Sequence, residues 1–267
     1  MSLLKIGATG PETVALQEAL ARENFSPGLA HGEFGPATEA APIAFQKSEN
    51  LTPDGIAGLA TRAALHLPPV PGPADMTAHV TVDMARQMFP GTRVAAIAAN
   101  LPHVLKALGA AGIGDKTMVL AALATIRAEA APFEPLAEGV SRYNTSPNGH
   151  PFDLYDNRKD LGNRGAPDGA KFRGRGFVQL TGRANYTTYA ARLDSGIDLA
   201  GHPERACDPD VAAKLLALFL KDKERRIREA LADGDLRAAR KLVNGGSHGL
   251  NEFADAYAAG ERAIPET

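Results

Sequence analysis

Residues 171–186 read KFRGRGFVQLTGRANY, the most distinctive string in the chain. Glycines bound a short run, Phe177 to Thr181, in which apolar and polar side chains alternate. Because successive side chains of a strand point to opposite faces, alternation predicts that Gln179 and Thr181 share one face. The plainer alternative is a strand edge that ends in a glycine turn.

The polar side chains of this string have a pattern that suits carbohydrate. Amide and hydroxyl groups such as those of Gln179 and Thr181 can bind sugar hydroxyls and hold a water molecule. If a helix begins after Thr181, Asn185 and Tyr186 return close to the same cleft. We therefore interpret the string as one wall of a binding site.

On both sides of this string the chain reads mainly as helix. Met118 to Ile126 is apolar nearly all round, which predicts a central buried helix. By contrast, residues 143–175 are rich in Gly, Pro, Asn, Asp and Arg, and we interpret them as an ordered cleft wall. The expected helical segments are Val82–Met88, Arg93–Leu108, Asp115–Ala130, Asp210–Ala232, Leu236–Leu242 and Asn251–Ala263.

Glu129 stands at the end of the expected buried helix. Burial there disfavours the charged form of a carboxyl, which is what a general acid needs near neutral pH. The alternative is a surface glutamate at a helix end, paired with Arg127 or Arg142. The residue type alone leaves both interpretations open.

Glu138 follows Glu129 by nine positions. On a continuous helix the two would lie about 13 Å apart along the axis. Pro132 and Pro135 make a continuous helix unfavourable, so the chain can fold back and bring the carboxyls together. Inverting glycoside hydrolysis needs two carboxyls about 6.5–9.5 Å apart. Glu134 is a competing second carboxylate with less freedom to face Glu129.

The first 65 residues contain an internal repeat. Residues 32–38 and 55–61 both read Gly-x-x-Gly-x-x-Thr, 23 positions apart. Such a pattern predicts a glycine turn followed by a helix that begins near the threonine. With a helix before the first turn and one at Thr38 to Ser48, which contains Pro42, the region forms a three-helix unit.

A proline-rich stretch separates this unit from the rest. We expect residues 1–67 to be the small module, 68–78 an extended linker, and 79–267 a larger helical domain. The linker would tether one domain to a surface while the other works nearby.

Composition indicates a folded soluble protein and excludes several partners. The 267 residues are 44% hydrophobic and 22% charged, with a net charge of −2. Residues 1–78 carry −4 and the remainder +2, so neither part is basic enough for nucleic acid to be the main partner. No apolar run is long enough to insert into a membrane.

The N-terminus lacks the apolar stretch of a signal peptide. We expect synthesis in the cytoplasm, and a target outside the membrane would require another agent to release the protein. A monomer is the simplest expectation.

Metal, cofactor and thiol chemistry find no support in the sequence. Cys207 has no His/Asn partner pattern near it and is interpreted as a packed thiol. His248, next to Asn244, could touch a substrate. No spacing among the histidines is that of a metal site, so we expect neither metal nor organic cofactor; they are His31, His66, His79, His103, His150, His202 and His248.

The N-terminal pattern resembles the peptidoglycan-binding-domain-1 family over about residues 5–67. The resemblance rests on Leu16-Gln17, Phe45-Gln46 and the two glycine repeats. His31 departs from it, since an aspartate commonly precedes that glycine. The resemblance implies a module that binds bacterial peptidoglycan. The expected place of action is then the cell wall in the periplasm, after synthesis in the host cytoplasm and release.

The string at residues 171–186 resembles the signature of glycoside hydrolase family 19, in its phage-endolysin branch. The resemblance runs from about residue 92 to 262 and includes Tyr143-Asn144 and Val243–Gly246. It implies a mainly α, lysozyme-like domain. Two departures are Ala128, where many relatives have His, and a Glu–Glu spacing shorter than in plant chitinases.

The same resemblance implies roles for individual residues. Glu129 is similar to the general acid, Glu138 to the general base, and Thr181 to the residue that holds the water. The positions implied to bind substrate are Gln179, Asn185, Tyr186, Asn244 and Tyr143. The expected reaction is hydrolysis of the β-1,4 bond between N-acetylmuramic acid and N-acetylglucosamine.

Three other functions stay open on the sequence. A chitinase of the same fold would act on chitin, although the N-terminal module favours peptidoglycan. An amidase or peptidase would need a metal cluster or a Cys/His pair, and the sequence has no pattern for either. A non-catalytic wall-binding protein would have lost the chemistry that the two glutamates and Thr181 provide.

Overall fold

The protein is mainly helical, as predicted, and divides into two compact units. The computed structural model describes residues 4–68, 74–193, 196–244, 246 and 248–265. Residues 1–73 form the first unit and residues 74–267 the second. The helices are α1 (Pro11–Arg22), α2 (Pro36–Ser48), α3 (Leu59–Ala64), α4 (Val82–Met88), α5 (Val94–Ala110), α6 (Lys116–Glu129), α7 (Asp153–Asp156), α8 (Asp168–Lys171), α9 (Arg183–Ala190), α10 (Pro209–Lys221), α11 (Glu224–Ala232), α12 (Leu236–Asn244) and α13 (Leu250–Ala263).

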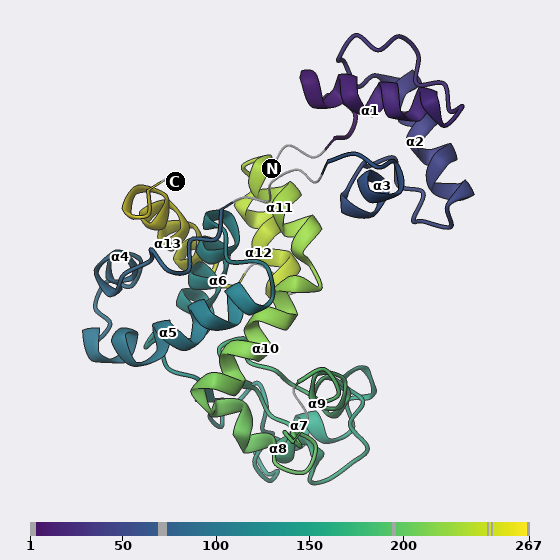
Figure 1. The fold of residues 1–267 in the computed structure, drawn as a ribbon. Helices are drawn as coiled ribbons and strands as arrows, with labels where there is room; N and C mark the ends of the chain where they lie inside the picture. Colours follow the sequence, from purple (N-terminus) through teal and green to yellow (C-terminus); the bar gives the residue numbers. More distant parts are fainter. Residues whose placement is uncertain (1–3, 69–73, 194–195, 245, 247, 266–267) are drawn as a thin grey trace. The chain divides into compact units, whose positions relative to one another are not determined.

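The first unit contains α1, α2 and α3 around its own apolar core (Figure 1). Pro11 and Pro36 occupy the first positions of α1 and α2, where a missing N–H costs nothing. Pro42 lies inside α2 without ending it. Leu16, Leu20 and Phe45 are buried in this core, so the unit has an apolar interior independent of the second unit.

The sequence repeat has the same hydrogen bonds in both copies. The Gln17 amide accepts from the Gly32 N–H and donates to the Thr38 hydroxyl, each at 3.0 Å. Gln46 accepts from the Gly55 N–H and donates to the Thr61 hydroxyl at the same distances. Gly32 and Gly55 both have positive φ. A buried glutamine therefore fastens each glycine turn to the threonine of the next helix.

His31 replaces the aspartate of the second copy. Asp54 Oδ1 accepts from the Ile56 N–H at 2.9 Å and from the Gln46 amide at 3.0 Å. His31 Nδ1 accepts from the Glu33 N–H at 3.2 Å, which is the corresponding backbone group. In the first turn, the imidazole nitrogen therefore accepts the backbone hydrogen bond that the Asp54 carboxylate accepts in the second turn.

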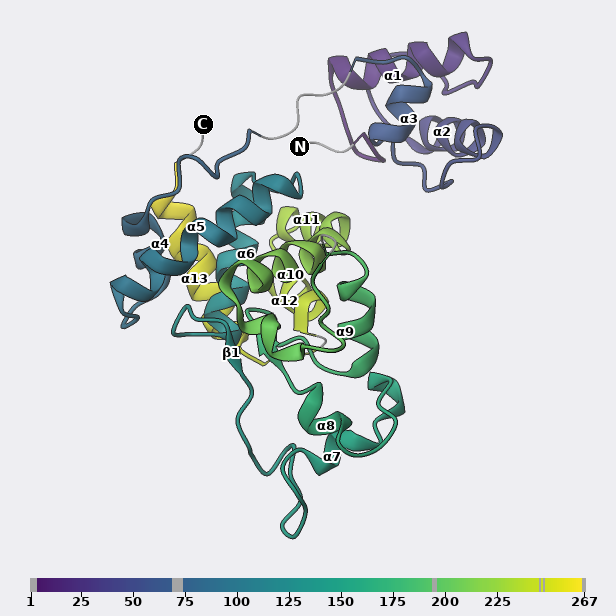
Figure 2. The ribbon, with the colours of Figure 1, turned by 60° about the horizontal axis from the view of Figure 1, so that its bottom comes forward.

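The second unit is built around α6. Its residues Met118 to Ile126 are all buried, as the sequence predicts. Asp115 caps its N-terminus by accepting from the Met118 N–H at 3.4 Å, and α4, α5, α10, α11 and α13 pack around it (Figure 2). α6 therefore delivers Glu129 from a rigid base.

The segment from α7 to α9 lies apart from α6, and both views show α7, α8 and α9 gathered at the opposite side of the unit from α4 and α13. A separate core holds it together, with Phe172, Leu180 and Tyr186 fully or nearly buried. β2 (Arg175–Gly176) lies in this segment and pairs antiparallel with β1 (Leu136–Ala137). The 3-10 turns are η1 (Lys159–Leu161), between α7 and α8, and η2 (Pro203–Cys207), between α9 and α10.

Two expectations about boundaries differ from the structure. The single helix expected at Asp210–Ala232 is broken into α10 and α11, which allows Arg228 to reach Asp115 at 2.6 Å. Residues 74–78, expected in the linker, belong to the second unit: the Met76 N–H donates to the Gly114 carbonyl at 2.8 Å, and its side chain is buried. Of the expected linker, residues 69–73 lie outside the described residues.

No helix in the described ranges is at once long enough and apolar enough to cross a bilayer.

Candidate active site

Glu129 is the last residue of α6 and is largely covered. Its carboxylate accepts from Arg240 Nη2 at 2.7 Å, and the Arg240 side chain on α12 is fully buried. Arg240 Nε in turn donates to the His248 carbonyl at 3.0 Å. The sequence suggested Arg127 or Arg142 as the partner of Glu129. In the structure the partner is the buried guanidinium of Arg240, 111 positions further along the chain.

The chain reverses directly after Glu129. Ala130 closes α6, and Phe133, with φ of 59°, is buried between Phe89 and Phe177 at ring-centre distances of 4.6 and 6.1 Å. Burial of this ring fixes the course of the segment that follows. Glu134 pairs with Arg93 at 2.6 Å, so the competing carboxylate is engaged at the surface.

Glu138 lies directly after β1 and opposite Gly174. Its N–H donates to the Gly174 carbonyl at 2.8 Å, which extends the ladder of β1 and β2 by one position. Its carboxylate accepts from the Gly174 N–H at 3.2 Å and from Asn144 Nδ2 and the Tyr155 hydroxyl at 2.9 Å each. Three donors therefore hold Glu138 in one orientation.

Tyr155 and Asn144 are residues whose roles the sequence did not indicate. Burial and the hydrogen bond to Glu138 raise the pKa of Tyr155 to about 12, so its hydroxyl remains a donor at neutral pH. Asn144 is fully buried and also donates to the Gly139 carbonyl at 2.8 Å. The family resemblance included Asn144 and the long polar loop included both residues, but their bonds to Glu138 depend on the tertiary fold.

Three predicted site residues gather at Gly174. A Cβ atom there would lie 2.8 Å from Gln179 Oε1 and 3.2 Å from both Glu138 Oε2 and Thr181 Oγ1. Glu138 Oε2 and Thr181 Oγ1 are therefore no further apart than twice the 3.2 Å that separates each from this Cβ position. A water molecule between them would meet one acceptor and one hydroxyl.

The expected strand at Phe177–Thr181 is a turn instead. β2 ends at Gly176, Gln179 has φ of 49°, and the chain returns to bridge Arg175 at Leu180. Gln179 Nε2 donates to the carbonyls of Leu136 and Gly176 at 3.0 and 3.1 Å, which fastens the turn to β1. A reversal of the chain, and not strand alternation, brings Gln179 and Thr181 to one side.

Tyr186 does not contact a cleft, which corrects the expectation that it binds substrate. Its side chain is fully buried; its hydroxyl donates to the Arg173 carbonyl at 2.9 Å and accepts from Arg175 Nη1 at 3.1 Å. Burial raises the pKa of Tyr186 to about 12. Tyr186 therefore supports the segment that carries Gly174.

The other expected substrate residues lie in different settings. Asn185 is exposed on α9 and donates to the Thr181 carbonyl at 2.8 Å. Tyr143 is 74% exposed and its hydroxyl accepts from Arg142 at 2.7 Å. Asn244 ends α12, and its side chain lies outside the described residues.

Exposed apolar side chains occur on the segment that contains Glu138 and on the chain that follows it. Leu136, Val140, Tyr143 and Leu154 all keep more than 40% of their surface accessible to solvent. Apolar and aromatic surfaces of this kind suit the C–H faces of sugar rings. The segment around Glu138 therefore combines held polar groups with an apolar rim.

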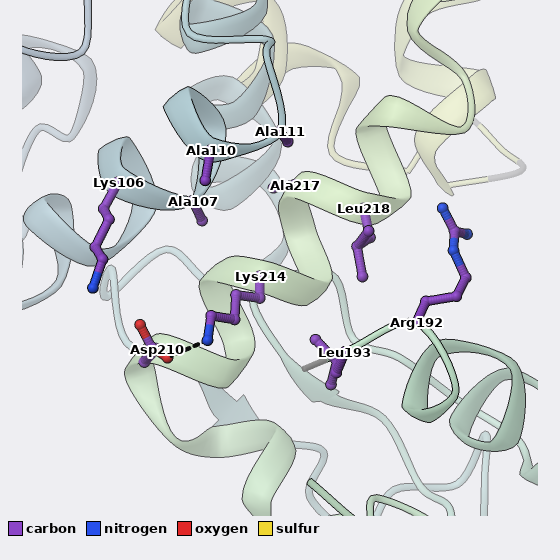
Figure 3. Close-up of a pocket in the computed structure, with 10 residues that line it drawn as sticks. All are labelled: Lys106, Ala107, Ala110, Ala111, Arg192, Leu193, Asp210, Lys214, Ala217 and Leu218. Atoms are coloured by element: carbon purple, nitrogen blue, oxygen red, sulfur yellow. Dashed lines mark ion pairs between the residues drawn. The ribbon is translucent and has the colours of Figure 1, made fainter. Parts of the chain in front are cut away.

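Elsewhere in this unit the cavity drawn in Figure 3 contains none of these residues. It measures about 200 Å³, lies between α5 and α10, and is mostly apolar, with Lys214 paired to Asp210 at 3.0 Å. No group of three His, Cys, Asp or Glu side chains suited to a metal ion occurs within the part of the chain that the structure describes.

Comparison with known families identifies the first unit. Residues 9–65 match the family described as "Putative peptidoglycan binding domain". A protein of Haemophilus influenzae described as a "Glycosyl hydrolase family 19 domain-containing protein" is 31% identical over 110 residues, which is 40% of this chain and 49% of that protein. The chain is therefore similar to a peptidoglycan-binding domain over residues 9–65 and, over 110 residues, to a protein with a glycosyl hydrolase family 19 domain. It spans about half the length of that relative.

Solved structures with similarity to this chain include a chitinase and a phage endolysin. Chitinase C from Streptomyces griseus is 20% identical, with a TM-score of 0.48, over 69% of this chain and 76% of that chain. A Burkholderia AP3 phage endolysin is 18% identical, with a TM-score of 0.28, over 98% of this chain and 99% of that chain.

Proposed function

We propose that the protein hydrolyses the glycan strand of bacterial peptidoglycan. The observation that carries the proposal is that one chain is similar both to a peptidoglycan-binding domain and to a protein with a glycosyl hydrolase family 19 domain. The first brings the protein to its polymer, and the second supplies two glutamates in a polar setting. The proposed partner is peptidoglycan and not nucleic acid, and the protein would act on the bacterial cell wall as a monomer.

Glu129 is the general acid of this proposal. It would protonate the glycosidic oxygen as the bond breaks, while Arg240 holds the carboxyl in place through its hydrogen bond at 2.7 Å. The position at the end of a buried helix keeps this group from turning away into solvent.

Glu138 is the general base, and Thr181 orients the water. A water molecule beside Gly174 would donate to Glu138 Oε2 and meet Thr181 Oγ1. The Thr181 hydroxyl already donates to the Gln179 carbonyl at 2.8 Å, so its lone pairs face the water. Attack from the side opposite Glu129 gives inversion at the anomeric carbon.

The bond cut is the one on the reducing side of N-acetylmuramic acid. Soluble fragments released from purified peptidoglycan, reduced with borohydride and weighed by mass spectrometry, test this. Muramitol ends support the proposal. Glucosaminitol ends would move the cut to the other glycan bond, free stem peptides would exclude a glycosidase, and release from chitin alone would make the protein a chitinase.

Removing either carboxylate tests the mechanism. Glu129→Gln and Glu138→Gln are each expected to lower the rate by about 10²–10⁴-fold, the usual contribution of a positioned acid or base. Glu134→Gln is the matched control, because its carboxylate pairs with Arg93 at the surface. Unchanged melting temperatures would show that the loss is chemical. A Glu129→Gln protein with most of its activity would contradict the assignment.

A further inference from the structure

Arg127 is a partly covered cation, and the described residues provide it with no partner. It lies in the last turn of α6, two residues before Glu129. Its side chain has no hydrogen bond or ion pair to any described residue, although most of its surface is covered. A guanidinium carries five N–H donors in a planar fork that matches a carboxylate. A bound carboxylate would give these donors a partner of opposite charge.

Arg127 lines a cavity of about 300 Å³ near the candidate acid. The opposite wall is the turn Pro90–Arg93 before α5, and Ala131 and Pro132 form its edge. The Thr92 hydroxyl donates to the Ala131 carbonyl at 2.8 Å, which ties this wall to the residues that follow Glu129. Arg93 pairs with Glu134, whereas Arg127 has no partner among the described residues and is therefore available to a ligand there.

We propose that this cavity receives a carboxylate of the peptide stem of peptidoglycan, and that Arg127 binds it. The inference rests on the proposed function. Each muramic acid carries a lactyl-linked peptide with free carboxylates, whereas chitin carries no charge. Arg127 thereby becomes a residue that distinguishes the two polymers.

The distances allow one substrate to occupy both places. Two residues of helix separate Arg127 from Glu129 by about 3 Å along the axis. Three extended residues of a stem span about 10 Å. The two side chains leave the helix about 200° apart around its axis. A stem that starts on the sugar next to the cut bond would therefore pass round the C-terminal end of α6 to reach this cavity, a path of about the 10 Å width of a helix.

The test changes the charge of the enzyme and of the substrate independently. Soluble glycan strands with intact stems are used as such, or after their carboxyls have been converted to amides with carbodiimide and ammonia. The wild-type protein is expected to lose about tenfold in kcat/KM on the amidated strands, the effect of one charged hydrogen bond. On native strands, the kcat/KM of Arg127→Gln is expected to be about tenfold below that of the wild-type protein. On amidated strands, the two proteins are expected to have the same kcat/KM.

Two further variants separate specific from general effects. Arg226→Gln, an exposed arginine on α11, should keep the wild-type response to amidation. Arg127→Lys keeps the charge and should keep part of the discrimination. Equal losses for Arg127→Gln on both substrates, or no loss on either, would overturn the inference. Absence of any cleavage by the wild-type protein would instead refute the proposed function.

Discussion

At the scale of single residues, Gly174 is the centre of the candidate site. Its N–H and carbonyl both bond Glu138, and its missing side chain leaves the space into which Glu138, Gln179 and Thr181 point. Gly174 does not have positive φ, so its backbone would accept alanine. The glycine is therefore required for space beside the carboxylate.

Gly174→Ala should lower activity by tenfold or more while leaving the fold intact. The added methyl group would stand 3.2 Å from the oxygens of Glu138 and Thr181, where the attacking water must fit. Gly139→Ala is the matched control, because a Cβ there meets nothing within 4 Å and the backbone again lacks positive φ. Initial rates on peptidoglycan measure the loss of activity of the two variants, and their melting temperatures show whether the fold is intact. Full activity of Gly174→Ala would show that no water is held there.

At the scale of elements, the wall of residues 143–175 is ordered by polar side chains. Asp168 is buried; it accepts from Arg183 Nε at 2.7 Å and from the Arg164 N–H at 2.9 Å, and its second oxygen bonds Arg183 Nη2. Asn163 Oδ1 accepts from the Arg183 N–H at 2.9 Å. These bonds attach the loop to the start of α9, which carries Asn185.

Acid should loosen this wall through Asp168. The hydrogen bonds from Arg183 hold the pKa of Asp168 below its ordinary value of 3.8. Its stabilising effect is therefore complete above that value and is lost as pH falls through the lower pKa of the folded state. Asp168→Asn should cost about 2 kcal/mol at pH 6 and less at pH 3. Urea unfolding of both proteins at the two pH values measures this, and a difference independent of pH would contradict it.

At the scale of the whole molecule, the chain has two units with separate cores, and in the proposed function the first binds the polymer and the second cuts it. The first unit buries its own apolar residues, and the second is built around α6. Tethering one binding event to another raises the local concentration of the second partner. The benefit is expected only where the substrate is a large fixed polymer.

Removing residues 1–73 should therefore have different effects on different substrates. Activity on insoluble wall fragments should fall by tenfold or more, because tethering through the first unit is lost. Activity on short soluble glycan strands should remain within about twofold, since that reaction needs only the second unit. The comparison of the two rates is the measurement. Equal losses on both substrates would mean that the first unit contributes to the chemistry or to the stability of the second.

The sequence by itself determined the mainly helical class, the central buried helix and the glycine repeat, because these depend on local periodicity and on backbone freedom at glycine. It also marked Glu129, Glu138 and Thr181 as candidates. Only the tertiary structure decided their partners: Arg240, Asn144 and Tyr155 come from distant segments, and no local pattern specifies such contacts. For the same reason Tyr186, which stands four residues after Gly182, lies in the core and not in a cleft. The burial of Tyr186 depends on which side of α9 the long loop covers, and tertiary packing determines that side.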